Sequence, residues 1–127
     1  MENLYLKVNL SKIEKNISII RNILGNKKII AVVKGDAYGL GLQKICDFLE
    51  DKVDMFGVSN LEEAIKLYEM GIQNEIMILT PIISEDYFQN EFIEKFTITI
   101  DNFEILSSIH KINSQMPQHV YRITDSH

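Results

Sequence analysis

Apolar and polar residues alternate along the chain with two periods, which predict a repeat of strands and helices. Short apolar runs of strand length begin near Ile29, Met55, Ile76, Phe96 and His119. The segments between them carry apolar residues at intervals of three and four, the spacing of an amphipathic helix. The pattern predicts an α/β domain of about five parallel strands joined by helical crossovers.

The clearest predicted helix precedes the first strand. Ser11 and Glu14 have the spacing of a capping box, and Gly25 supplies a stop signal. Its apolar face consists of Ile13, Ile17, Ile20 and Leu24. We expect this face to pack against the sheet.

Further helices are predicted after the strands. The second helix follows the first strand, and its apolar positions are Leu42, Ile45, Cys46 and Leu49. The third starts in residues 59–63, which offer two overlapping capping boxes, and it ends at Gly71. Residues 84–94 predict a less regular helical stretch, and residues 103–111 complete another helix.

Two architectures are compatible with parallel strands joined by helices. An eight-stranded barrel takes about 250 residues, so the 127 residues here would form little more than half of one. An open doubly wound sheet of five strands would fit the length of the chain. The regular repeat without a long connection weakly favours the barrel, because a reversal of strand order can also be made by short loops.

The composition of the chain argues against several classes of protein. Thirteen basic and eighteen acidic residues give a net charge of −5, so no nucleic-acid partner is expected. Cys46 is the only cysteine, which excludes an intramolecular disulfide and favours a reducing compartment with a core role for the thiol. No apolar window has the length of a membrane span, so we expect a cytoplasmic protein. The three histidines lie at no metal-ligand spacing, and no metal site is predicted.

Lys34 is the strongest candidate for chemistry. It ends the apolar run 29–33 and is followed by three glycines, Gly35, Gly39 and Gly41, with Tyr38 among them. A lysine at the end of a strand can simply meet solvent, but ligands of α/β sheets also collect at the carboxyl ends of strands. A phosphate-binding P-loop is excluded, because the lysine precedes the glycines.

The segment 31–41, Ala-Val-Val-Lys-Gly-Asp-Ala-Tyr-Gly-Leu-Gly, resembles the pyridoxal-phosphate attachment signature of the alanine racemases, Ala-Val-Val-Lys-Ala-Asp-Ala-Tyr-Gly-His-Gly. Nine of the eleven positions agree. The resemblance extends to residues 8–10, 54–59, 61–64, 71–72 and 76–79, and so it covers nearly the whole chain. A decarboxylase or cofactor-carrier barrel built around the same lysine is less compatible with residues 36–39.

The resemblance implies a fold and an activity. In the family, an eight-stranded (β/α)8 TIM-type barrel holds the cofactor and is followed by a mostly β domain, and the enzyme is a head-to-tail dimer. Residues 1–127 would then be the amino-terminal part of the barrel domain, without the carboxy-terminal β domain. The implied activity is the interconversion of L-alanine and D-alanine, which supplies D-alanine to the cell wall.

The resemblance also assigns site residues. Lys34 matches the lysine that the family joins to pyridoxal 5'-phosphate as a Schiff base and uses as a catalytic base. Tyr38 matches a tyrosine that lines the cofactor site near the phosphate. The cofactor expected from the resemblance is therefore pyridoxal 5'-phosphate, and the substrate is a small amino acid.

Several positions depart from the family pattern. Gly35 replaces an alanine, Leu40 replaces a histidine, and the strand lysine of the family falls on Ile123. The second catalytic base, a tyrosine of the family's second domain, has no counterpart here, so we expect the chain to be incomplete and inactive alone. The alternative is a non-catalytic domain, binding pyridoxal phosphate or another chain, that pairs through an open sheet edge near residues 120–123. Its partner would be a second copy or a separately encoded remainder.

Overall fold

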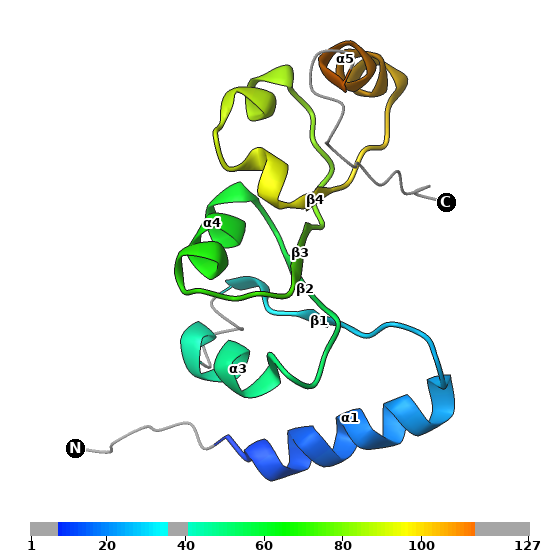
Figure 1. Cartoon of the computed structure of the whole chain (residues 1–127), viewed down its shortest axis with the longest axis vertical. Coiled ribbons are helices and arrows are strands. Elements are labelled where there is room, and N and C mark those ends of the chain that lie inside the picture. The colour runs from blue at the N-terminus through cyan, green and yellow to red at the C-terminus, as the bar shows by residue number, and fades with distance from the viewer. Residues whose placement is uncertain (1–7, 36–40, 114–127) are drawn as a thin grey trace, which may run out of the picture.

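Strands and helices alternate along the chain (Figure 1). The computed structural model describes residues 8–35 and 41–113, without the side chains of residues 110, 112 and 113. Within these ranges the strands are β1 (Ile30–Val32), β2 (Met55–Val58), β3 (Glu75–Ile78) and β4 (Thr97–Ile98). The helices are α1 (Leu10–Leu24), α3 (Leu42–Leu49), α4 (Leu61–Glu69) and α5 (Phe103–Asn113), with 3-10 helices η1 (Glu85–Gln89) and η2 (Ile93–Lys95).

The described strands form one parallel sheet in the order β1-β2-β3-β4, which is also their order in the sequence. Ala31, Phe56 and Ile76 lie side by side in three neighbouring strands. The prediction of parallel strands alternating with helices is confirmed. The fifth predicted strand, near residues 119–123, lies outside the described residues.

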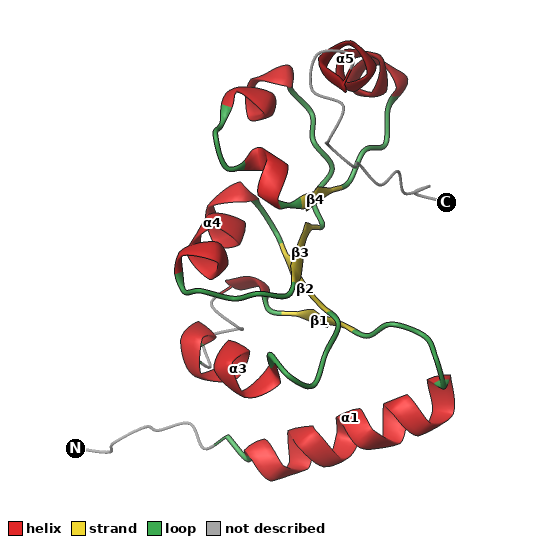
Figure 2. Cartoon of the chain, viewed as in Figure 1, coloured by secondary structure: helices red, strands yellow, loops and turns green. Residues whose placement is uncertain are grey.

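The two faces of the sheet differ. Figure 2 shows α3 and α4 on the same side of the strands. The side chains in contact with these helices form one buried cluster, which includes Val33, Phe56, Val58, Ile76, Ile78, Ile98 and Ile100 of the sheet segments and Ile45, Cys46, Ala64 and Leu67 of the helices. Side chains alternate along a strand, and on the other face of β1 both Ile30 and Val32 are 42% exposed.

This asymmetry favours the barrel over the open doubly wound sheet. A doubly wound sheet reverses its strand order and carries helices on both faces. Here the order has no reversal in the described part, and α3 and α4 share a face. A barrel puts helices on its outside only and fills its inside with side chains from the strands. Ile30 and Val32 therefore occupy the positions of barrel-interior side chains.

The start of α1 differs from the prediction. The helix is capped by Asn9, whose side-chain oxygen accepts a hydrogen bond of 3.1 Å from the backbone N–H of Lys12. Ser11 consequently lies inside the helix, and the predicted capping box of Ser11 with Glu14 was wrong. Asparagine and serine are equally good caps, and Asn9 has the extended backbone that a cap needs. The predicted stop at Gly25 is confirmed, since its N–H donates to the carbonyl of Arg21.

The apolar face of α1 is only partly covered. Ile13 and Ile17 pack against the core, as predicted, but Ile20 and Leu24 are 42% and 37% exposed. The carboxyl half of α1 is instead held by a polar contact. The Arg21 guanidinium donates to the carbonyl of Lys52 at 2.9 Å and to the carboxylate of Asp54 at 3.2 Å.

Asp54 joins α1 to the beginning of β1. Besides Arg21, its carboxylate accepts a hydrogen bond of 2.7 Å from the backbone N–H of Ile29. This backbone hydrogen bond, with the positive charge of Arg21, lowers the pKa of the Asp54 carboxyl below its ordinary value. The residue before β2 therefore fixes the residue before β1 through a side chain.

The remaining helices follow the predicted order. The whole predicted apolar face of α3 is buried. Asn60 caps α4 by accepting a hydrogen bond from the N–H of Glu63. The irregular stretch predicted at 84–94 consists of η1 and η2, tighter helices that proteins use in short pieces. Asn102 accepts a hydrogen bond from the N–H of Ile105 in α5.

Candidate functional site

The candidate site lies where β1 and β2 end. Lys34 is two residues beyond the last residue of β1, and its side chain is exposed. Ser59 and Asn60 follow β2 and lead into α4. Because adjacent parallel strands have their carboxyl ends at one edge of the sheet, these segments are neighbours. Tyr38, the other predicted site residue, lies outside the described residues.

Gly35 gives the backbone after Lys34 an unusual conformation. Its φ angle is +63°, in the left-handed region that favours glycine. Among residues 8–35 and 41–113, and leaving aside its own chain neighbours, no heavy atom lies within 4 Å of the position that a Cβ atom would occupy there. Glycine in place of the family's alanine thus suits the local backbone.

Glu63 links the ends of the two strands. Its Oε1 atom accepts a hydrogen bond of 2.9 Å from the N–H of Gly35, and its Oε2 atom accepts one of 2.7 Å from the N–H of Ser59. The sequence pattern placed Glu63 in a capping box at the start of a helix, and its carboxylate does bind backbone near that start. The hydrogen bond to Gly35, 28 residues earlier, was not predicted.

The arrangement presents one primary amine at an open position. Among the described residues, no carboxylate forms an ion pair with Lys34. A primary amine is the group that condenses with an aldehyde, with loss of water. The carboxylate of Glu63 acts on the neighbouring backbone instead.

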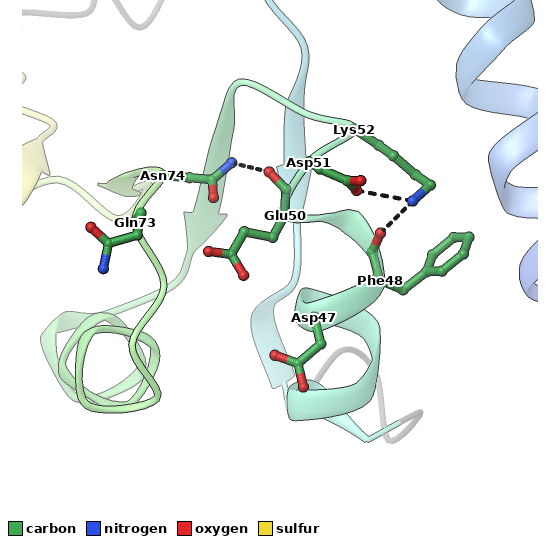
Figure 3. A pocket seen from close by; sticks show the side chains of 7 residues that line it. All are labelled: Asp47, Phe48, Glu50, Asp51, Lys52, Gln73 and Asn74. Atoms are coloured by element: carbon green, nitrogen blue, oxygen red, sulfur yellow. Dashed lines mark hydrogen bonds and ion pairs between the residues drawn. The ribbon is translucent and has the colours of Figure 1, made fainter.

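A hollow lies at the opposite end of the strands from Lys34 (Figure 3). It is open to solvent and is lined by Asp47, Phe48, Glu50, Asp51, Lys52, Gln73 and Asn74. Its polar groups bind one another: the Lys52 ammonium donates to Asp51 and to the carbonyl of Phe48, and the Asn74 amide donates to the carbonyl of Glu50. These contacts join the end of α3 to the segment before β3, so the hollow has a structural role.

Cys46 and the side chains of metal-binding type were also considered as candidates for chemistry. Cys46 is fully buried, which raises the pKa of its thiol to about 11, so the predicted role as core filler is confirmed. Within residues 8–35 and 41–113, no three side chains of metal-binding type come together. In the same residues no helix has the length and apolarity to cross a membrane.

Comparison with known proteins gives a consistent result for nearly the whole chain. The family model "Alanine racemase, N-terminal domain" matches residues 8–123. The alanine racemase of Haemophilus influenzae is 33% identical over 120 residues, which cover 94% of this chain and 33% of that protein. The alanine racemase of Streptococcus equi subsp. zooepidemicus is 38% identical over 122 residues. The chain spans about a third of the length of these relatives.

Solved structures support the same fold. The alanine racemase of Acinetobacter baumannii superposes with a TM-score of 0.78 at 22% identity, covering 91% of this chain and 34% of that one. The alanine racemase of Clostridium difficile 630 gives a TM-score of 0.70 at 32% identity, covering 86% and 28%. The predicted TIM-barrel architecture is confirmed for this part of a barrel. From the family match and the shared fold, the chain belongs to the alanine racemase family.

Proposed function

We propose that Lys34 is the attachment residue for pyridoxal 5'-phosphate in an amino-acid racemase, and that residues 1–127 form the amino-terminal part of its barrel domain. The carboxy-terminal β domain would be a separate part of such an enzyme. One observation carries the proposal: Lys34 is exposed and follows β1 at the carboxyl edge of the sheet, next to the positive φ angle of Gly35. Similar proteins named alanine racemase make L-alanine and D-alanine the proposed substrates.

The chemistry fits this assignment. Pyridoxal phosphate, when bound, supplies an electron sink that makes the α-hydrogen of an amino acid acidic. Lys34 holds the group through its amine nitrogen and, once released by the substrate, can take or return a proton on one face of the α-carbon. Tyr38 is proposed to line the site near the phosphate. A supply of D-alanine for the cell wall is the proposed role, and a cytoplasmic location fits the single reduced cysteine.

Covalent attachment at Lys34 is the test of this proposal. The amine nitrogen replaces the aldehyde oxygen of the cofactor, that oxygen leaves as water, and borohydride then adds hydride to the carbon–nitrogen double bond. We expect the chain, incubated with pyridoxal phosphate and reduced, to carry a stable adduct that peptide mass spectrometry maps to Lys34. The Lys34→Ala variant should lose this adduct completely.

Lys28 provides a matched control, because it is an exposed lysine two residues before β1, at the other end of the strand from Lys34. The Lys28→Ala variant should keep the full yield of adduct at low cofactor concentration. Labelling spread evenly over surface lysines, or an unchanged total in Lys34→Ala, would reject the proposal.

A second candidate function, pairing with another chain, is favoured by the exposed apolar residues of α1. They are Ile19, Ile20 and Ile23. Exposed apolar residues grouped on one helix are typical of surfaces that bind protein. We expect sedimentation velocity to show a dimer whose fraction rises with protein concentration. The Ile23→Asn variant should raise the dissociation constant of this dimer about tenfold, because one apolar side chain is no longer buried in the interface. A monomer at all concentrations would count against self-pairing.

A further inference from the structure

We propose that Glu63 is a positioning residue for Lys34. Its carboxylate holds the backbone that follows Lys34 against the segment that follows β2, and thereby fixes the direction in which the lysine amine points. This inference rests on the proposed function of Lys34, and it assigns a role to a residue of α4 that was expected only to start a helix.

The geometry assigns one carboxylate oxygen to each strand end. Oε1 accepts from the N–H of Gly35 at 2.9 Å, and Oε2 accepts from the N–H of Ser59 at 2.7 Å. Hydrogen bonds from backbone N–H groups to an ionised carboxylate are stronger than those between neutral groups. A single side chain therefore ties the residue after Lys34 to the residue after β2, across 24 positions of the sequence.

Glu63 itself is held on a rigid support. Its own N–H donates to the side chain of Asn60 at 2.9 Å, in the first turn of α4. The next residue, Ala64, is fully buried against the core cluster. The carboxylate thus projects from a helix start that the burial of Ala64 keeps in place.

The backbone at Gly35 needs such an anchor. Glycine has more accessible conformations than any other residue, and the φ angle of Gly35 is +63°. Without the hydrogen bond from its N–H, Gly35 could rotate and move Lys34 with it. Because reaction rates and covalent equilibria depend on the placement of the reacting atom, loss of this bond should act at Lys34.

The Glu63→Gln variant tests the role with little change in shape. An amide group keeps only one acceptor oxygen, so the N–H of Gly35 or that of Ser59 must lose its partner. The Asn60→Ala variant removes the helix cap but leaves both carboxylate bonds, and it serves as the control for destabilised α4. Glu62→Gln, a change at the neighbouring exposed carboxylate, serves as the control for charge.

Two readouts decide the proposal. The first needs no cofactor: in Glu63→Gln, amide hydrogen exchange followed by NMR should speed up about tenfold at Gly35 or Ser59, and in Glu62→Gln neither amide should change. The second is the equilibrium constant for the Lys34 adduct with pyridoxal phosphate. It should fall about tenfold in Glu63→Gln, the effect of one charge-assisted hydrogen bond, and by less than twofold in Asn60→Ala.

Any other outcome would overturn either the positioning role of Glu63 or the proposed function of Lys34. Unchanged exchange at both amides in Glu63→Gln would show that the carboxylate does not hold these segments. Faster exchange with an unchanged adduct constant, or an equal fall in Asn60→Ala, would reduce Glu63 to a structural residue. If the unaltered chain forms no adduct at Lys34, the proposed function fails, and the exchange measurement alone still shows whether Glu63 holds the two segments.

Discussion

The Phe56→Ala variant is expected to lose about 3–5 kcal/mol of unfolding free energy, the usual cost of removing a buried phenyl ring. Phe56 lies in β2 between β1 and β3 and is 0% exposed. Its ring belongs to the core cluster shared by the sheet with α3 and α4. The cavity left by alanine would therefore touch several elements at once, and the loss would be a large part of the total stability of a small domain.

Urea denaturation followed by circular dichroism measures this loss. Phe103→Ala is the matched control, since Phe103 lies on α5 and is 85% exposed, and its removal should change the unfolding free energy by less than about 0.5 kcal/mol. If Phe56→Ala has no folded baseline, Phe56→Leu supplies a milder change. Equal unfolding free energies for the Phe56 and Phe103 variants would mean that the core is not centred on β2.

The sequence patterns that predicted most of the fold are local and repeated. Strand runs bounded by helices with clear apolar faces identified β1 to β4, α3 and α4, because each element buries a face whose period can be read from a dozen residues. The same patterns predicted the buried side of α3 in full. Parallel pairing followed from the crossovers and required no further information.

The boundaries of α1 and its packing were harder to predict. Asn9 and Ser11 are both good caps, and nothing in the local pattern distinguishes them. The coverage of Ile20 and Leu24 depends on what lies beside α1 in space, and spacing along the helix says nothing about that. Packing of this kind is decided by tertiary neighbours.

The candidate site, like the fold, could be predicted from the sequence only in part. Lys34 could be identified from the glycine-rich segment and its resemblance to a family signature, both of which are contained in eleven residues. The contact of Glu63 with Gly35 joins two elements that are far apart in the sequence. The local sequence pattern correctly identifies Glu63 as a carboxylate at the start of a helix. It gives no information about the contact of this carboxylate with Gly35, after β1. Only the parallel pairing of β1 with β2 brings the two together.

Ala64→Leu is expected to disturb both the fold and the site. Ala64 is 0% exposed, and α4 packs on β2 and β3. Three additional carbon atoms have no space at this contact, so the unfolding free energy should fall by about 2–3 kcal/mol through overpacking. Relief of the clash requires α4 to move away from the strands. That movement carries Glu63, the adjacent residue, away from the N–H groups of Gly35 and Ser59.

The control is Lys66→Leu, which adds an apolar side chain to an exposed position of the same helix and should leave both properties unchanged. Urea denaturation gives the stability of each variant, and amide hydrogen exchange at Gly35 reports the state of the site. We expect Ala64→Leu to change both and Lys66→Leu to change neither. A destabilised Ala64→Leu with unchanged exchange at Gly35 would mean that the position of α4 and the geometry at Lys34 are independent.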